Sequence, residues 1–156
     1  MKLFIPGGCL CGAVHFAIVA PPRTLYACHC SDCQTATGSA FVLAMRVPID
    51  GITVTQGETK AFERSRSDGR KRNLYRCTKC LTALWSEALL SPEYLTVYAG
   101  TLDDTSRLEP VGHLWTSDAL PWVTIPNGDL VFTHGAPDMK LFEDAWSRRE
   151  AVKSRE

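Results

Sequence analysis

Seven cysteines lie in three short clusters, and no cysteine falls outside them: Cys9-x-Cys11, Cys28-x-Cys30-x-x-Cys33 and Cys77-x-x-Cys80. Thiolates are soft ligands, and a gap of one or two residues lets two of them reach the same ion, so this spacing indicates zinc. Two closed tetrahedral sites would need eight ligands, one more than the cysteines supply. The count therefore predicts one site with a position left for another ligand, as catalytic zinc sites have.

Disulfides and redox pairs account for these cysteines less well. A secreted disulfide scaffold usually has an even cysteine count and a signal peptide, whereas the apolar start at Met1–Ile5 is broken by Pro6–Gly8. A redox Cys-x-x-Cys pair should stand alone after a strand, not beside five further thiols. We therefore expect reduced cysteines and a cytoplasmic protein.

The composition argues against membrane and nucleic-acid partners. The 156 residues are 45% hydrophobic and 22% charged, which suits one globular domain with a real core. Seventeen basic and seventeen acidic residues give a net charge of zero, which is unfavourable for binding a phosphate backbone. No apolar run approaches the ~18 residues of a membrane span. We interpret the basic cluster at 64–72 as a solvated hairpin edge, with a nucleic-acid patch as the alternative.

Short β-prone runs separated by turn-forming residues predict a mainly β fold. Gly, Pro, Asp and Asn recur roughly every ten residues, a rhythm typical of all-β architectures. Strands are expected near 14–18, 41–45, 52–56, 60–66, 71–75 and 94–99. Asp68-Gly69 is a hairpin signal between two of them.

Helix is expected in two places. Ser31 could cap a short turn through Thr37, with Gly38 as its stop. The tail from Pro137 carries an apolar stripe at helical spacing, formed by Met139, Phe142, Ala145 and Trp146. We expect this amphipathic helix to dock on the body of the protein or on another subunit, which makes a homo-oligomer possible. The chain is thus divided into a zinc-binding domain at 1–136 and a helix with a frayed end, Lys153 to Glu156, at 137–156.

The cysteine clusters can be assigned to two metal ions. Cys77 and Cys80 sit in a turn between two predicted strands and need two more ligands, which Cys9 and Cys11 supply. These four cysteines form the predicted structural zinc site. The second zinc is held by the compact group Cys28, Cys30 and Cys33.

The fourth position of the second site is expected to be water, substrate or a non-cysteine side chain. His29 lies between two ligands, and adjacent side chains in an extended segment diverge. Proton transfer beside the ligands, or a surface position, therefore suits His29 better than direct binding of the metal. A distant histidine could close the site instead, namely His15, His113 or His134. A zinc held by three thiolates is electron-rich and prefers a soft donor such as a substrate thiolate. The chemistry therefore favours thiols over hydrolysis.

Several segments together carry the pattern of a known family: Gly8–Val14, Cys28–Cys33, Thr37–Phe41, Arg76–Cys80, Ala99–Asp104, His113–Trp115 and Pro121–Trp122. On these residues the chain resembles the glutathione-dependent formaldehyde-activating (GFA) family, which also contains the centromere protein V type of domain. The resemblance implies small antiparallel sheets around a structural zinc, a β-tent, with a second zinc near a glutathione-binding cleft. It also implies a carbon–sulfur lyase or S-(hydroxymethyl)glutathione synthase, which joins glutathione to formaldehyde. Carried over by position, Cys9, Cys11, Cys77 and Cys80 are the structural ligands, and Cys28, Cys30 and Cys33 the catalytic ones.

Two departures from the family pattern bear on the sites. Leu81 stands where family members usually have glycine, so the local geometry at the structural zinc is expected to differ. Gln34 and Thr35 stand where basic residues are common, so a small thiol other than glutathione becomes possible.

Other candidate contacts follow the second cysteine group. Thr37, Gly38 and Ser39 could offer amides and hydroxyls to a substrate carboxylate, or could simply end a turn. His113, Trp115 and Trp122 either line the cleft or belong to the core.

Three functions remain open from the sequence. The first is a zinc enzyme that binds a small thiol such as glutathione and adds or releases a small carbonyl carbon. The second is a non-catalytic carrier of glutathione or its adducts. The third is a zinc-stapled interaction module with two closed sites.

Overall fold

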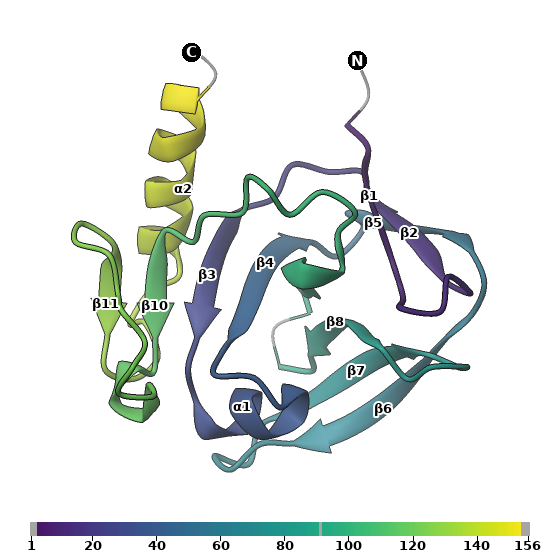
Figure 1. The fold of residues 1–156 in the computed structure, drawn as a ribbon, viewed down its shortest axis with the longest axis horizontal. Helices are drawn as coiled ribbons and strands as arrows, with labels where there is room; N and C mark the ends of the chain where they lie inside the picture. Colours follow the sequence, from purple (N-terminus) through teal and green to yellow (C-terminus); the bar gives the residue numbers. More distant parts are fainter. Residues whose placement is uncertain (1–2, 91, 154–156) are drawn as a thin grey trace. The chain divides into compact units, whose positions relative to one another are not determined.

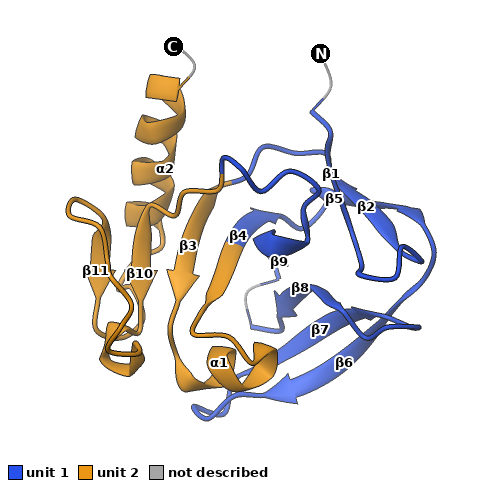
Figure 2. Ribbon diagram, viewed as in Figure 1, with its two compact units in different colours: residues 1–22, 45–107 blue, residues 23–44, 108–156 orange. Residues whose placement is uncertain are grey.

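The structure is a computed structural model that describes residues 3–90 and 92–153. The fold is mainly β with a helix near the C-terminal end, as the sequence predicts. The chain divides into two compact units, shown in Figure 2. Unit 1 comprises residues 1–22 and 45–107, and unit 2 comprises residues 23–44 and 108–156.

Unit 1 contains two antiparallel groups of strands (Figure 1). The first has the order β1-β2-β5 and is built from β1 (Ile5–Gly8), β2 (His15–Ile18) and β5 (Ile52–Gln56). The second has the order β9-β8-β7-β6 and is built from β6 (Thr59–Ser65), β7 (Lys71–Cys77), β8 (Ala83–Ala88) and β9 (Tyr94–Tyr98). A short 3₁₀ turn, Ala99–Thr101, follows β9.

β2 and β9 form where alternating apolar residues predict them. Phe16 and Ile18 of β2 are buried, and so are Leu95 and Val97 of β9. Each such side chain contributes roughly 1.5–3 kcal/mol when it leaves water. Phe16 also packs edge-on against Trp85, with ring centroids 5.4 Å apart. The predicted strands are confirmed to within a few residues.

The basic cluster at 64–72 lies on the β6–β7 hairpin, which turns at the predicted Asp68-Gly69. Its side chains contact polar partners within unit 1: Arg70 with Asp68, Lys71 with Glu63, and Arg72 with Ser86 and Thr96. β6 also ends the order of strands in its sheet. These contacts suit the solvated-edge interpretation.

Unit 2 contains two parallel strand pairs, which the sequence pattern did not predict. β10 (Gly112–Leu114) runs parallel to both β3 (Thr24–Cys28) and β11 (Leu130–Phe132). A 3₁₀ turn, Thr116–Asp118, lies in the connection from β10 to β11. β4 (Val42–Pro48) begins in unit 2 and continues into unit 1. Strands of three residues are too short for alternation to identify, so their direction depends on contacts distant in sequence.

The two predicted helices both form in unit 2. α1 spans Ser31–Thr37 and ends at Gly38, whose φ of 68° is the left-handed conformation expected of a helix stop. Its N-cap is Cys30 rather than Ser31, and the Cys30 side chain makes no capping hydrogen bond, whereas the Asp118 carboxylate accepts the Ser31 N–H at 3.1 Å. The Ser31 cap is therefore wrong by one residue, since Ser31 already belongs to the helix.

α2 spans Lys140–Lys153 and packs on β3 and its neighbours through the predicted apolar stripe. Phe142 is fully buried, and its ring lies 5.7 Å from those of both Tyr26 and Phe132. Gly112 allows this approach, because a Cβ there would come within 2.8 Å of both Leu130 and the Phe142 ring. The stripe therefore docks on the body of unit 2.

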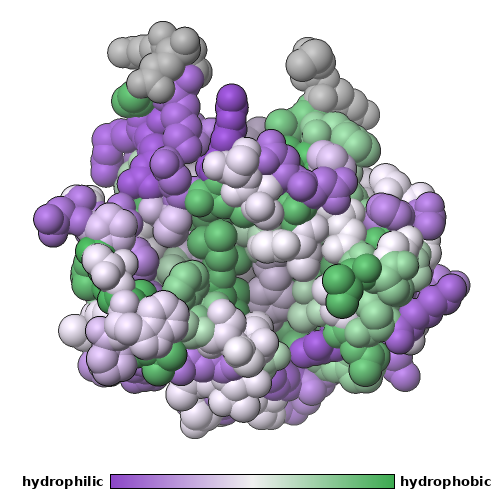
Figure 3. Space-filling view, viewed as in Figure 1, coloured by the Kyte–Doolittle hydropathy of each residue, from purple (hydrophilic) through white to green (hydrophobic). Residues whose placement is uncertain are grey.

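The outward side of α2 is mostly hydrophilic (Figure 3). Leu141 and Val152 are its exposed apolar side chains, and association of copies through them stays a prediction. Lys153, expected to be frayed, is the last residue of α2 and pairs with Glu109 at 3.1 Å. The rest of the predicted frayed end, 154–156, lies outside the described residues. None of the helices in the described part of the chain has the length and apolar character needed to cross a bilayer.

Candidate metal centres

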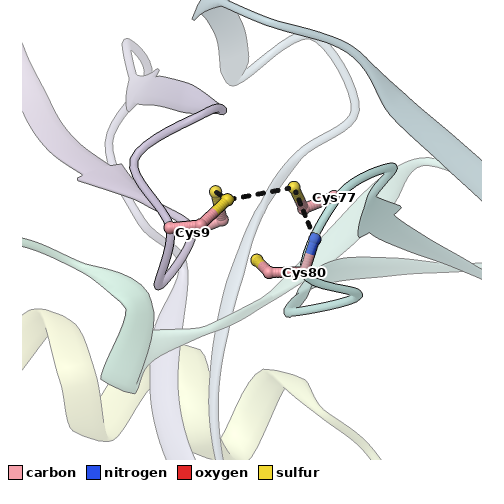
Figure 4. Close-up of side chains that lie close together, drawn as sticks. Cys9, Cys77 and Cys80 are labelled. Carbon is pink, nitrogen blue, oxygen red and sulfur yellow. Dashed lines mark hydrogen bonds between the residues drawn. The ribbon is translucent and has the colours of Figure 1, made fainter.

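The structure brings Cys9, Cys11, Cys77 and Cys80 together in unit 1. Their sulfur atoms all lie within 4.8 Å of one another. Cys9 follows β1, Cys77 ends β7, and Cys80 lies in the turn before β8. Figure 4 shows the side chains of Cys9, Cys77 and Cys80 pointing toward one another. Residues nearly seventy positions apart thus meet at the predicted structural site.

The local backbone favours thiolates at this group. The N–H groups of Lys79 and Cys80 point at the Cys77 sulfur, 3.3 and 3.5 Å away. Val14 donates in the same way to the Cys9 sulfur at 3.2 Å. Burial raises the pKa of Cys9, but this N–H and the neighbouring thiols outweigh burial and hold the pKa below its ordinary value.

Cys80 has an acidic thiol. Its sulfur lies 3.1 Å from the hydroxyl of Thr82. This hydroxyl and the Thr82 N–H lower the pKa of Cys80 to about 5. A thiol that is already deprotonated at neutral pH releases no proton when it binds a metal ion, which strengthens binding there.

Two of the sulfur–sulfur distances match those of a zinc site. Zinc binds thiolates at about 2.3 Å in a tetrahedron, which places the sulfurs about 3.8 Å apart. The Cys9 and Cys11 sulfurs are 3.6 Å apart, and those of Cys11 and Cys77 are 3.9 Å apart. This group could therefore hold a metal ion through four cysteines.

The second group, Cys28, Cys30 and Cys33, forms in unit 2 where β3 passes into α1. The three sulfurs lie within 4.8 Å of one another, and those of Cys28 and Cys30 are 3.5 Å apart. The Cys30 carbonyl accepts the N–H groups of Cys33 and Gln34, so the first turn of α1 holds Cys33 against the other two. Cys28 and Cys30 are buried, whereas Cys33 is half-buried. A ligand would therefore approach from the Cys33 side.

Among the described residues, no histidine or carboxylate joins these three sulfurs. His15 lies in unit 1, and His134 packs edge-on against Trp115. His29 and His113 contact each other. Within the described residues, the ligand atoms of the second group are therefore its three cysteine sulfurs.

Crowding raises the pKa of two thiols of the second group, Cys28 and Cys33. The Cys30 thiol raises the pKa of Cys28 to about 11. Cys28, followed by Cys30, raises the pKa of Cys33 far above its ordinary range. Three thiolates so close together repel one another, and a divalent ion removes that repulsion. This group, too, could hold a metal ion.

Comparison with known proteins places both cysteine groups in a family. The family model described as the glutathione-dependent formaldehyde-activating enzyme matches residues 4–118, which include all seven cysteines. This chain belongs to the GFA family. A Halomonas elongata protein, provisionally named a glutathione-dependent formaldehyde-activating enzyme, is 30% identical over 154 residues, covering 94% of this chain and 96% of that protein.

A solved structure resembles the GFA fold of this chain. The crystal structure of a Rhodobacter sphaeroides protein aligns with a TM-score of 0.53 over 66% of this chain and 92% of the other. At 18% identity, this likeness concerns the fold alone.

Leu81, one of the two departures from the GFA pattern, keeps a conformation suited to glycine. Its φ is 62°, in the left-handed region, and its N–H donates to the Cys77 carbonyl at 3.1 Å. The expected change in local geometry is thus not seen at the backbone. Leu81 instead adopts a strained conformation while its side chain stays 56% exposed.

Leu81→Gly is expected to stabilise the protein by up to about 1 kcal/mol, because glycine adopts positive φ without a Cβ clash. The measurement is the midpoint of thermal unfolding of the zinc-loaded chain. Leu10→Gly is the matched control: Leu10 is 92% exposed at the same cysteine group and has an ordinary negative φ. That variant should be neutral or destabilised, and equal shifts in both variants would contradict the strain.

Gln34, the other departure, holds the segment that carries the second group. Its side-chain amide donates to the carbonyls of His29 at 2.7 Å and Asp118 at 2.8 Å. It thus ties the 28–33 segment to the 3₁₀ turn after β10. A basic side chain at this position could not make the same contacts without a change of geometry.

Thr37, Gly38 and Ser39 form the C-terminal cap of α1 and are exposed. The Gly38 N–H donates to the Gln34 carbonyl, and the Ser39 N–H to the Thr37 hydroxyl. The Thr37 hydroxyl donates to the Cys33 carbonyl at 2.9 Å. These contacts describe a helix cap, and their binding of a substrate carboxylate stays a prediction.

The sequence left two residues near the second group unnoticed, Asp129 and Arg149. Asp129 lies 3.3 Å from His113, and Arg149 lies 3.1 Å from Asp129. His29 is fully buried and not on the surface. Burial, followed by the adjacent His113 ring, lowers the pKa of His29 below its ordinary value. Of the aromatic candidates, Trp115 packs in the core of unit 2, whereas Trp122 is exposed.

Proposed function

We propose that this GFA family member is a zinc-dependent enzyme that binds a small thiol, glutathione in the first instance, and joins it to or releases it from a small carbonyl carbon such as formaldehyde. What carries the proposal is a group of three converging cysteine sulfurs from one short segment, with one of them half-buried. The family and the named Halomonas relative support the choice of glutathione and formaldehyde.

Each cysteine group has a distinct task in this proposal. Cys9, Cys11, Cys77 and Cys80 would hold a structural zinc. Cys28, Cys30 and Cys33 would hold the second zinc, which supplies a coordination position where a thiol loses its proton at neutral pH. With its seven cysteines reduced, the protein would work in the cytosol.

The reaction is an addition in which nothing is oxidised or reduced. The thiol sulfur forms a bond to the carbonyl carbon, and the carbon–oxygen π bond breaks. The proton lost by the thiol ends on the new hydroxyl, and the reverse reaction is the lyase direction. The chain holds the sulfur beside Cys33, the most accessible thiol of the group, while the burial of Cys28 and Cys30 limits the access of water.

The test is the rate of S-(hydroxymethyl)glutathione formation, measured by NMR exchange with and without the zinc-loaded protein. We expect two zinc ions per chain and a rate above that of the spontaneous reaction. Glutathione binding without acceleration would support the carrier function instead. Two slowly exchanging zinc ions with no glutathione binding would support the interaction module.

A further inference from the structure

A buried chain of hydrogen bonds in unit 2 connects the second cysteine group to α2. His29 Nε2 lies 2.9 Å from His113 Nδ1. His113 Nε2 lies 3.3 Å from Asp129 Oδ2, and the other oxygen of Asp129 accepts from Arg149 at 3.1 Å. The side chains of His113 and Asp129 are only 5% and 7% exposed. The proposed reaction, as described so far, uses none of these four residues.

Arg149 and Asp129, at one end of these hydrogen bonds, determine which ring nitrogens of neutral His113 and His29 carry a proton. Arginine only donates and a carboxylate only accepts, so Asp129 receives a hydrogen bond from His113 Nε2–H. In the neutral His113 ring, Nδ1 is then an acceptor, and it takes the Nε2–H of His29. The Nδ1 atom of a neutral His29 is consequently unprotonated.

The fold holds the members of this chain in place. β10 pairs with β3, so His113 lies opposite Ala27, two residues before His29. β11 pairs with the other side of β10 and begins directly after Asp129. Arg149 also donates to the Pro110 carbonyl at 2.7 Å. The chain is therefore anchored on three strands or their ends and on α2.

The far end of the chain has no partner among the described residues. His29 Nδ1 is buried and makes no hydrogen bond, although its ring is fully enclosed. The centroid of this ring lies 5.2 Å from those of both His113 and Phe41. In the sequence, His29 stands between Cys28 and Cys30, two members of the cysteine group. A buried lone pair without a partner is costly, so such an atom requires an explanation, and a catalytic role is one of them.

We propose that Asp129 and His113 are positioning residues that fix His29 with an unprotonated Nδ1, so that Nδ1 accepts a hydrogen bond from the hydroxymethyl group of an adduct bound at Cys28, Cys30 and Cys33. The use of this lone pair rests on the proposed function, whereas the tautomer does not. A hydroxymethyl adduct carries an O–H donor that glutathione lacks. An acceptor beside the sulfur group therefore distinguishes the adduct from the free thiol.

The test uses the full zinc-loaded chain labelled with ¹⁵N-histidine, in which NMR distinguishes protonated from unprotonated ring nitrogens. We expect an unprotonated His29 Nδ1 in the wild type, and its resonance should shift when glutathione and formaldehyde are added. A protonated Nδ1 in the wild type overturns the proposal by itself. So does a direct coupling of Nδ1 to ¹¹³Cd in the cadmium-substituted protein, because the metal would then use the lone pair.

Asp129→Asn reverses the donor and acceptor roles along these hydrogen bonds, while the side chain at position 129 keeps its size. Arg149 requires the amide oxygen, so the amide nitrogen turns to His113 and donates to Nε2. The proton then moves to His113 Nδ1, and His29 ends with a protonated Nδ1. Turnover should fall about 10–100-fold, as is typical when a residue behind a metal site is changed. Asp129→Glu keeps both acceptors and should restore the wild-type tautomer.

Glu109→Gln is the matched control, since Glu109 and Asp129 line the same cavity of about 940 Å³ in unit 2. It makes the same carboxylate-to-amide change at a side chain outside the four hydrogen-bonded residues. It should change neither the tautomer of His29 nor the turnover rate. An Asp129→Asn protein that changes tautomer but keeps its full turnover would refute the positioning role. If the wild type has no turnover, the proposed function fails, and the adduct-induced shift at His29 Nδ1 still decides this inference.

Discussion

Cys77→Ala is expected to leave unit 1 unfolded and to release one zinc ion. Cys77 is fully buried at the end of β7, and its sulfur accepts two backbone N–H groups. Its group joins the segment after β1 to the turn before β8. Binding of a structural zinc contributes about 10–16 kcal/mol, whereas a whole domain is stable by only about 5–15 kcal/mol. The loss of one ligand therefore endangers the fold itself.

The measurement combines zinc content with an amide NMR spectrum of the variant. Lys79→Ala is the control, because Lys79 is exposed in the same turn and contributes only a backbone N–H to the site. This variant should keep both zinc ions and a dispersed spectrum. A folded Cys77→Ala protein that retains two zinc ions would show that the four-cysteine group is not a structural metal site.

The cysteine sites could be predicted because their ligands are local or strongly typed. Cys28, Cys30 and Cys33 lie within six residues, so a single turn brings them together. Cys77 and Cys80 need a partner pair, and soft thiolates leave Cys9 and Cys11 as the remaining donors. Spacing and residue type were sufficient to group the sulfurs correctly, although Cys11 and Cys77 are far apart in the sequence.

The hydrogen-bond chain behind the second group could not be predicted in this way. His113 and Asp129 are sixteen residues apart, and no periodic pattern connects them. They meet because β10 and β11 are parallel, a pairing that strands of three residues do not announce. Asn127-Gly128 lies just before β11, but a turn does not show which strand will follow in the sheet.

Leu81 illustrates a different limit. The sequence comparison with the GFA pattern correctly identified the position, because glycine is the residue that a left-handed turn prefers. Another residue in this place still has the left-handed conformation that glycine prefers, since φ at Leu81 is 62°. The four sulfurs and the strands on either side determine this turn more strongly than the preference of one residue does. The departure therefore affects stability rather than structure.

Cys30→Ala is expected to abolish thiol binding and turnover while the fold and one zinc ion remain. Cys30 lies at the centre of the second group, 3.5 Å from Cys28, and its carbonyl begins α1. Only the side chain is lost, so the backbone contacts that start the helix persist. Two thiolates cannot retain the second zinc as three do, and the remaining position for a substrate thiol disappears with it. The first cysteine group belongs to unit 1 and keeps its four ligands.

Glutathione binding by calorimetry, zinc content and the exchange rate of formaldehyde decide this prediction together. Thr35→Ala is the control, since Thr35 is an exposed residue of the same helix, and it should leave all three quantities unchanged. The contrast with Cys77→Ala is the sharper result. Cys30→Ala is expected to lose activity and keep its fold, whereas Cys77→Ala is expected to unfold. Undiminished glutathione affinity in Cys30→Ala would place the thiol elsewhere on the protein. The three-sulfur group would then be a second structural metal site, which stabilises α1 and does not bind a substrate.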